Sequence, residues 1–121
     1  MAVTHGAPTR SAIATAVLGQ IDAGTAGNLV FRTAGAAEAA TLALSVVSGI
    51  VAAAVLTFEP ISDDASATGG TTDNATIEDS AAATVLACSV GTVGEDINLS
   101  SVSIGVGDTV TMTSLTYTAP V

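Results

Sequence analysis

The chain has 121 residues, which fits a single domain, and a formal net charge of −9 with only two strong cations, Arg10 and Arg32. A phosphate backbone or an anionic membrane surface needs clustered lysine and arginine, so the composition argues against nucleic-acid binding and against a membrane-surface role. Hydrophobic residues make up 49% of the chain but aromatic residues only 2%, so the core must be assembled from alanine, valine and leucine in small increments of buried area.

The N-terminal part predicts an arm followed by one helix. We expect residues 1–7 to form the arm and residues 8–121 to form a single domain that opens with a helix over 8–23. Pro8 suits the first helical turn, because its missing N–H would have no partner there, and Gly24 suits the left-handed position after the helix. The expected apolar stripe of this helix consists of Ile13, Val17 and Ile21. The polar face expected to point away from the core consists of Thr9, Ser11, Thr15 and Gln20.

Short β-prone runs separated by turn residues follow the helix. The expected strands cover residues 28–33, 38–46, 50–58, 75–78 and 83–90. The run of alanines at 52–54 has helical propensity, but its β-branched neighbours and the short distance between Gly49 and Pro60 favour one strand over 50–58. Both faces of the 83–90 run are apolar, which is typical of a central strand.

The stretch 96–118 is the longest run of strand composition, and we expect the rest of the chain to be organised around it. Before it, residues 61–72 have no apolar period and predict a loop with a flexible hinge or a bulge at 69–70. Inside the stretch, the sequence Gly-Val-Gly-Asp at 105–108 predicts a hairpin turn.

Apolar residues change parity near the end of this stretch. Val110 and Met112 would share one face of a strand, whereas Leu115 and Tyr117 would share the other. A bulge near 113–114 would restore the register, and passage from one sheet to another at a bend is the alternative. The whole pattern predicts a mainly β fold: an antiparallel β-sandwich of about seven or eight short strands with one N-terminal α-helix.

Two features bear on export and membranes. Residues 1–10 contain no apolar block, so we expect no signal peptide. The gap between Glu38 and Glu59 carries no charge and reaches the length of a bilayer span, but it contains serine, threonine and glycine and is flanked by acids. We therefore expect strands in this gap and no membrane helix.

The side chains that commonly carry out catalysis are few. His5 is the only imidazole and lies close to the N-terminus, while Cys88 is the only thiol and lies in an apolar strand pattern, where a buried, inert thiol is expected. Adjacent acids occur only in expected turns, where they act as solvated caps, at Asp63-Asp64, Glu78-Asp79 and Glu95-Asp96. The turn at 105–108 lacks the following helix and the lysine of a phosphate-binding loop. We expect no enzyme, no catalytic residues and no cofactor.

Metal ions and sugars are further alternatives. One cysteine and one histidine cannot build a zinc site, and we expect no metal centre. Oxygen ligands for a surface Ca²⁺ could converge from a set whose spacing differs from that of an EF-hand loop: Asp63, Asp64, Asp73 and Asn74. Patterns for N-glycosylation begin at Asn74 and Asn98, as expected by chance in a chain rich in serine and threonine. Sugar-binding platforms usually present tryptophan or tyrosine faces, and this chain has one tyrosine and no tryptophan.

Three blocks of sequence carry a resemblance to a known family. The first is MAVTH at 1–5 with SAIA at 11–14 and IDAG at 21–24, the second is ATGGT at 67–71, and the third runs from DINLSS at 96–101 through GDTV at 107–110 to LTYTAP at 115–120. In these blocks, which span nearly the whole chain, the sequence resembles a family of short proteins encoded by tailed bacteriophages and prophages and presumed to be structural. Because turn and strand residues make up the blocks, the resemblance identifies a lineage rather than an activity.

The resemblance implies a non-enzymatic component of a virion, assembled in the cytoplasm of a bacterial host. The expected role is that of a capsid decoration (cement) protein that stabilises the head shell, with the major capsid protein or other virion proteins as partners. A tail or head–tail connector protein is the close alternative, and a carbohydrate-binding appendage is the more distant one. We also expect a homo-oligomer, a trimer, held by an apolar patch within 42–58, because that stretch is long for a small core to hide.

Overall fold

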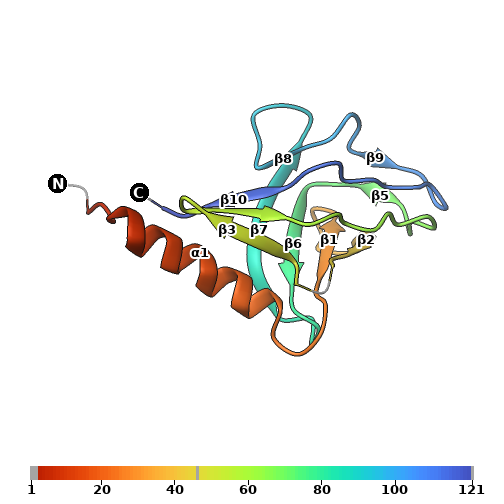
Figure 1. Ribbon diagram of the computed structural model, residues 1–121. Coiled ribbons are helices and arrows are strands. Elements are labelled where there is room, and N and C mark those ends of the chain that lie inside the picture. Colours follow the sequence, from red (N-terminus) through yellow and green to blue (C-terminus); the bar gives the residue numbers. More distant parts are fainter. Residues whose placement is uncertain (1–2, 46, 121) are drawn as a thin grey trace.

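The computed structural model describes residues 3–45 and 47–120 and shows a mainly β chain with one N-terminal helix (Figure 1). This coarse expectation is confirmed. The helix, α1, runs obliquely beside the curled sheets. Within the described residues, the strands form a five-stranded sheet, a three-stranded sheet and a two-stranded ribbon.

Helix α1 spans Ala7–Ile21, so it begins one residue earlier and ends two residues earlier than expected. Gly6 enters the helix in an extended conformation, with φ −66° and ψ 159°. Asp22 ends it and donates its N–H to Leu18 O at 3.0 Å, while its Oδ1 accepts the N–H of Ser48 at 3.0 Å. This last bond ties the C-terminal end of the helix to the segment that enters the three-stranded sheet.

The expected apolar stripe of α1 is confirmed. Ile21 is fully buried, and Ile13 and Val17 are partly buried against the same core. Ser11 was expected to face away from the core, and this is wrong, because its Oγ accepts the N–H of Ala54 at 3.2 Å. A small hydroxyl on the edge of the stripe therefore serves as a hydrogen-bond acceptor for a turn in the facing sheet.

Five strands form the larger sheet in the order β2-β1-β6-β7-β8, and every neighbouring pair is antiparallel except β7 and β8. The bounds are Asn28–Arg32 (β1), Glu38–Ala43 (β2), Asn74–Glu78 (β6), Thr84–Gly91 (β7) and Ile97–Asn98 (β8). The strands expected over 28–33, 75–78 and 83–90 are thus confirmed to within one residue, and the strand expected over 38–46 ends at residue 43. β7 has a neighbour on each side, although β8 pairs only with its last two residues.

The inner face of the five-stranded sheet supplies much of the core. In the strand register, Leu29 lies between Leu42 and Ile77, and all three are buried. Phe31 lies between Ala40 and an alanine of β6, and it is the largest fully buried side chain among the described residues. The two small alanines leave room for the ring, so one large side chain fills the space between neighbours that are small.

The three-stranded sheet shows that the single strand expected over 50–58 is wrong. Its strands, in the order β10-β4-β3, are Gly49–Ala52 (β3), Val55–Phe58 (β4) and Thr116–Thr118 (β10). The chain reverses at Ala53 and Ala54, whose φ values are 50° and 68°. Two-residue hairpin turns with positive φ at both positions normally use glycine, asparagine or aspartate, so two alanines carry no turn signal. Hydrogen bonds hold Ala54 in place: its N–H donates to Ser11 Oγ, and its carbonyl accepts the N–H of Ala119 at 2.9 Å.

Ala53→Asn is expected to stabilise the protein by about 0.5–1 kcal/mol, because asparagine tolerates the left-handed conformation that is costly for alanine. The Ala53 side chain is exposed, so the larger side chain extends into solvent. Ala65→Asn, in an exposed loop without positive φ, is the matched control and should change the free energy of unfolding by less than about 0.5 kcal/mol. Urea unfolding followed by circular dichroism measures both, and an unchanged or lower midpoint for Ala53→Asn would contradict the prediction.

The expectation that residues 96–118 organise the fold is wrong. Only short pieces of this stretch are strands, namely β8, β9 and β10, and they lie in three different sheets. The two-stranded ribbon consists of β5 (Gly70–Thr71) and β9 (Ser103–Ile104). A turn is present where Asp108 donates its N–H to Gly105 O at 3.1 Å, but it is not a hairpin turn, because β9 pairs with β5 and not with the residues after the turn. Residues 111–115 form no strand, so the change of parity occurs in an irregular passage toward β10 and not at a bulge.

Residues 61–69 form a loop, as expected, but the loop expected over 61–72 also contains β5, and hydrogen bonds fasten much of the loop along the outer edge of β2. The N–H groups of Thr41, Ser62 and Gly69 donate to Asp64 Oδ2, Ala43 O and Ala39 O, each at 2.9 Å. At the position of the expected hinge or bulge, Gly69 and Gly70 have φ values of 92° and 136°, and Gly70 begins β5. An open strand edge invites pairing with other chains, so the loop protects this edge of the sheet.

The uncharged gap between Glu38 and Glu59 contains strands, as expected. Its described residues contribute β3, β4 and most of β2. In the part of the chain that the structure describes, no helix is long and apolar enough to cross a membrane.

Candidate functional site

Glu78 was expected in a solvated turn, and this is wrong. It lies at the end of β6 and is only 5% exposed. Its Oε2 lies 2.6 Å from Arg32 Nη2 and accepts the hydroxyl of Thr76 at 2.7 Å. Arg32 also donates from Nε to Thr76 Oγ1 at 3.2 Å and from Nη1 to Ala36 O at 3.3 Å. These contacts make Glu78 part of a structural network on β1 and β6, which no local pattern could reveal because Arg32 is 46 residues away in the sequence.

Three other acids of the expected pairs cap nearby backbone groups, as expected for turn residues. The bonds run from the N–H groups of Ala81 and Ala83 to Asp79 Oδ1 at 2.9 Å, from Ser66 to Asp64 Oδ1 at 3.0 Å, and from Ser89 to Asp96 Oδ2 at 3.0 Å. Each of these three carboxylates therefore stabilises the local chain.

The residues of the candidate Ca²⁺ set also have local roles. Asp73 Oδ2 accepts the side-chain N–H of Asn74 at 3.0 Å, and Asp64 is engaged by backbone N–H groups of β2 and of its own loop. Among residues 3–45 and 47–120, no group of three or more histidine, cysteine, aspartate or glutamate side chains is arranged to hold a metal ion. Asp63, Asp64 and Asp73 therefore do not form such a group.

Cys88 lies half-buried on β7. Burial, and secondarily the nearby carboxylate of Asp96, raises the pKa of its thiol. A raised pKa keeps the thiol protonated near neutral pH, and the protonated form is a poor nucleophile. The geometry agrees with the expectation of an inert thiol, and His5 lies outside the sheet, in the exposed segment before α1.

We predict that iodoacetamide alkylates Cys88 several-fold more slowly in the native protein at pH 8 than in the urea-unfolded chain. The raised pKa lowers the native thiolate fraction, and this difference shrinks as the pH rises above the pKa of the native thiol. Asp96→Asn should increase the native rate by removing a negative charge, whereas Asp63→Asn, at an exposed loop position, should leave it unchanged. Equal rates for native and unfolded protein, measured by mass spectrometry, would contradict the prediction.

Both arginines of this acidic chain are engaged within the molecule. Arg32 pairs with Glu78, and Arg10 donates from Nη2 to Ala119 O at 2.9 Å and from Nε to Pro120 O at 3.2 Å. The charged surface of the described chain is therefore dominated by acids.

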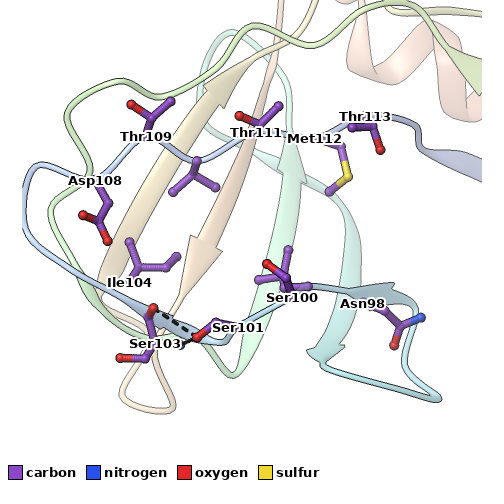
Figure 2. Close-up of a pocket in the computed structure, with 12 residues that line it drawn as sticks. Asn98, Ser100, Ser101, Ser103, Ile104, Asp108, Thr109, Thr111, Met112 and Thr113 are labelled. Carbon is purple, nitrogen blue, oxygen red and sulfur yellow. Dashed lines mark hydrogen bonds between the residues drawn. The ribbon is translucent and has the colours of Figure 1, made fainter.

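The clearest hollow is a shallow groove between residues 98–104 and 108–113, with a volume of about 440 Å³ (Figure 2). Apolar side chains contribute to its lining, among them Leu99, Ile104 and Met112. The remaining lining is mostly serine and threonine, and Asp108 is its one titratable side chain. The Asp108 carboxylate accepts the N–H of Gly105 at 2.8 Å and so stabilises the turn at one end of the groove.

Two further hollows adjoin residues 111–115. One, of about 250 Å³, lies against residues 96–98, and the other, of about 470 Å³, lies against residues 57–63. Met112 borders all three hollows. This segment is therefore bordered by hollows, although its composition is that of a strand.

None of the three aromatic side chains forms an exposed platform. Phe31 is fully buried, Phe58 is buried, and Tyr117 is half-buried on the inner face of β10, where it pairs with Leu56. A sugar-binding surface built on aromatic stacking is therefore not supported by their placement.

The outer face of the three-stranded sheet, called the sheet face below, is free of charged side chains. The strand register places six residues on it: Ile50, Ala52, Val55, Thr57, Thr116 and Thr118. Ile50 is 61% exposed, and Val47, just before β3, is 58% exposed. The sequence signal for this surface is the uncharged gap between Glu38 and Glu59, which contains β3 and β4.

Comparison with protein-family models, with curated proteins and with solved structures finds no match for this chain.

Proposed function

We propose that this protein is a non-enzymatic structural component of a tailed-phage virion, of the capsid decoration (cement) type. The observation that carries the proposal is the sheet face, which is uncharged and partly apolar on a chain whose net charge is −9. Its role would be to adhere to its neighbours in the shell. The resemblance of three sequence blocks to short structural proteins of tailed phages and prophages supports the same role.

Electrostatics explains why the sheet face is suited to contact between subunits. Copies that approach each other through their acidic surfaces bring carboxylates together, which is unfavourable, whereas the sheet face brings none. Ile50, on the edge strand β3, provides exposed apolar area on this face, and Val47, just before β3, is exposed as well. We therefore place the contact of a homo-trimer on this face, within the apolar stretch 42–58, with the major capsid protein or other virion proteins as further partners.

The proposal includes a sandwich arrangement of the two larger sheets, with α1 closing one open side. Support comes from a shared core: buried Leu29 and Phe31 of the five-stranded sheet and buried Leu56 of β4 belong to one cluster, together with Ile21 of α1. The helix contacts β3 and β4 of one sheet and β7 of the other. A compact module of this kind keeps its shape while it adheres to a shell.

The contact is tested with Ile50→Glu, which places a carboxylate on the sheet face at its most exposed apolar residue, on the edge strand β3. We expect trimers of the unmodified protein and monomers of the variant by light scattering, with equal circular dichroism spectra. Val93→Glu is the matched control, because Val93 is 81% exposed and lies outside the sheet face, and it should leave the trimer intact. An Ile50→Glu variant that remains trimeric would remove the sheet face from the proposal.

The virion role is tested on purified virions, which assemble in the cytoplasm of the bacterial host. Mass spectrometry with copy-number measurement and cryo-electron microscopy should find hundreds of copies on the head shell. A dozen or so copies in a ring would favour the alternative of a head–tail connector, and absence of the chain from the particle would overturn the proposal.

A further inference from the structure

Val47 has a backbone conformation that is costly for its type of side chain. Its φ is 58°, in the left-handed region, and it is the one β-branched residue with a positive φ in the part of the chain that the structure describes. The other positive-φ residues there are alanines and glycines. A branched side chain in this region crowds the following carbonyl oxygen, so the conformation persists only where the surrounding structure holds it.

Ser48, the next residue, is held on two sides. It is buried, its N–H donates to Asp22 Oδ1 and Oδ2 at 3.0 and 3.2 Å, and its carbonyl accepts the N–H of Glu59 at 2.9 Å. These bonds tie the entry of β3 to the end of α1 and to the chain after β4. The Val47 side chain is nevertheless 58% exposed, so the strained conformation presents it to solvent and adds little to the core of its own copy.

Val47 and Ile50 together form an exposed apolar pair, called the apolar knob below. Ile50 lies on the edge strand β3 and Val47 just before it, and no charged residue occurs between Glu38 and Glu59. Valine and isoleucine are stiff at χ1, and hydrogen bonds fix the backbone that carries them. Little conformational entropy therefore remains to be lost when a partner covers the apolar knob.

A hollow that could receive the apolar knob adjoins the same sheet face. It has a volume of about 470 Å³, lies between residues 57–63 and 111–115, and shares Thr57 with the sheet face. Glu59 and Asp63 line it, so an acidic segment is repelled there, whereas the apolar knob brings no like charge. Its apolar lining comes from Phe58, Pro60, Ile61, Met112 and Leu115.

The apolar knob and the hollow lie on different sides of β4. In the three-stranded sheet, β4 lies between β3 and β10. The apolar knob belongs to the β3 side, whereas residues 111–115 lead into β10 on the other side. An apolar knob that fills this hollow must therefore come from another copy. A contact between two different surfaces of identical chains closes into a ring when the rotation allows it, as a cyclic trimer requires.

We propose that Val47 and Ile50 of one copy insert into the hollow of about 470 Å³ of the next copy, so that Val47 anchors the trimer contact. This inference rests on the self-association proposed above, and it names the surface of the neighbour that receives the apolar knob. It also assigns a role to the strain: the left-handed backbone presents an apolar side chain to the neighbouring copy, at a cost to the stability of the isolated copy.

Val47→Gly tests the anchor because its two effects have opposite signs. Glycine relieves the strained backbone and removes the side chain. The urea midpoint of the dilute monomer should therefore rise, while the association constant, from light scattering over a concentration series, should fall by at least about tenfold. Val93→Gly is the matched control, because Val93 is exposed and its φ is not positive: its midpoint should not rise, and its association should be unchanged.

Disulfide trapping identifies the receiving surface, on the full chain with Cys88→Ser as background. Protein with Val47→Cys is mixed with protein carrying Ser114→Cys, at an exposed position that lines the hollow. In the control mixture, Thr25→Cys, exposed and outside the hollow, replaces Ser114→Cys. We expect at least about tenfold more disulfide-linked heterodimer with Ser114→Cys, because insertion of the apolar knob raises the effective concentration of the two thiols.

An unchanged association constant for Val47→Gly, or equal heterodimer yields in the two mixtures, would overturn the insertion. If Ile50→Glu still dissociates the trimer in that case, the sheet face stands and only the insertion fails. If the unmodified protein is monomeric at every concentration, the proposed self-association fails and the insertion fails with it. If the selective cross-link forms but the chain is absent from the virion, the insertion stands while the virion role fails.

Discussion

Replacing Phe31 with alanine is expected to lower the free energy of unfolding by about 3–5 kcal/mol, the largest loss from any single truncation in this chain. The ring is fully buried on the inner face of β1 and lies between Ala40 and Ala75 in the strand register. Both residues directly opposite in the strand register are alanines, which are too short to extend into the space, so much of the cavity should stay open. A loss of this size is a large fraction of the 5–15 kcal/mol that is usual for a domain.

Urea unfolding monitored by far-ultraviolet circular dichroism measures this loss, since the chain has no tryptophan to report by fluorescence. The midpoint should fall without a change in the slope of the transition. Val93→Ala removes apolar atoms at a site that is 81% exposed, and it should change stability by less than about 0.5 kcal/mol. A Phe31→Ala protein with an unchanged midpoint would place the ring outside the stabilising core.

Glu78→Gln is expected to cost about 2–3 kcal/mol, because the near-isosteric amide leaves Arg32 without its counter-charge. The side chains of Arg32 and Glu78 are 26% and 7% exposed, so water can reach the guanidinium and relieve part of the loss. Arg32→Met should cost more, since it strands a carboxylate that is almost fully covered.

A double-mutant cycle measures the interaction energy between Arg32 and Glu78 separately from the contacts that each residue makes with other groups. Arg32→Met combined with Glu78→Leu should cost clearly less than the sum of the two single changes, because neither partner is left alone in an apolar setting. Glu95→Gln, at an exposed acid of a turn, is the control and should be close to neutral. Strict additivity would mean that Arg32 and Glu78 stabilise the sheet independently of one another.

Sequence patterns predicted those elements whose information is local. The recurrence of Ile13, Val17 and Ile21 predicted the helix and its buried side, and the alternating runs predicted β1, β6 and β7 to within one residue. The periodicity of side chains along a helix or strand is enforced wherever one face is buried, so these elements can be recognised without knowledge of their partners.

The errors have long-range causes. The hairpin at Ala53 and Ala54 has no turn residues, and its conformation depends on Ser11 and Ala119, which are distant in the chain. Residues 111–114 have the composition of a strand but make no backbone hydrogen bond within the described chain, and strand propensity cannot supply a neighbour.

The candidate surfaces were predicted unevenly. The uncharged gap that ends at Glu59 pointed to the region of the sheet face, although not to the strands that build it, because the hairpin was missed. The groove had no signal of its own, since serine and threonine residues on either side of a turn are ordinary loop composition.

Helix α1 is anchored at both of its ends to strands that lie far from it in the sequence. Arg10 binds the carbonyl groups of Ala119 and Pro120, and the carboxylate of Asp22 accepts the N–H of Ser48. The helix therefore cannot swing outward as an independent lever while the sheets stay folded. The amide protons of its central turns should exchange with deuterium only when the entire cooperative unit melts, so the helix and the strands should share one opening free energy.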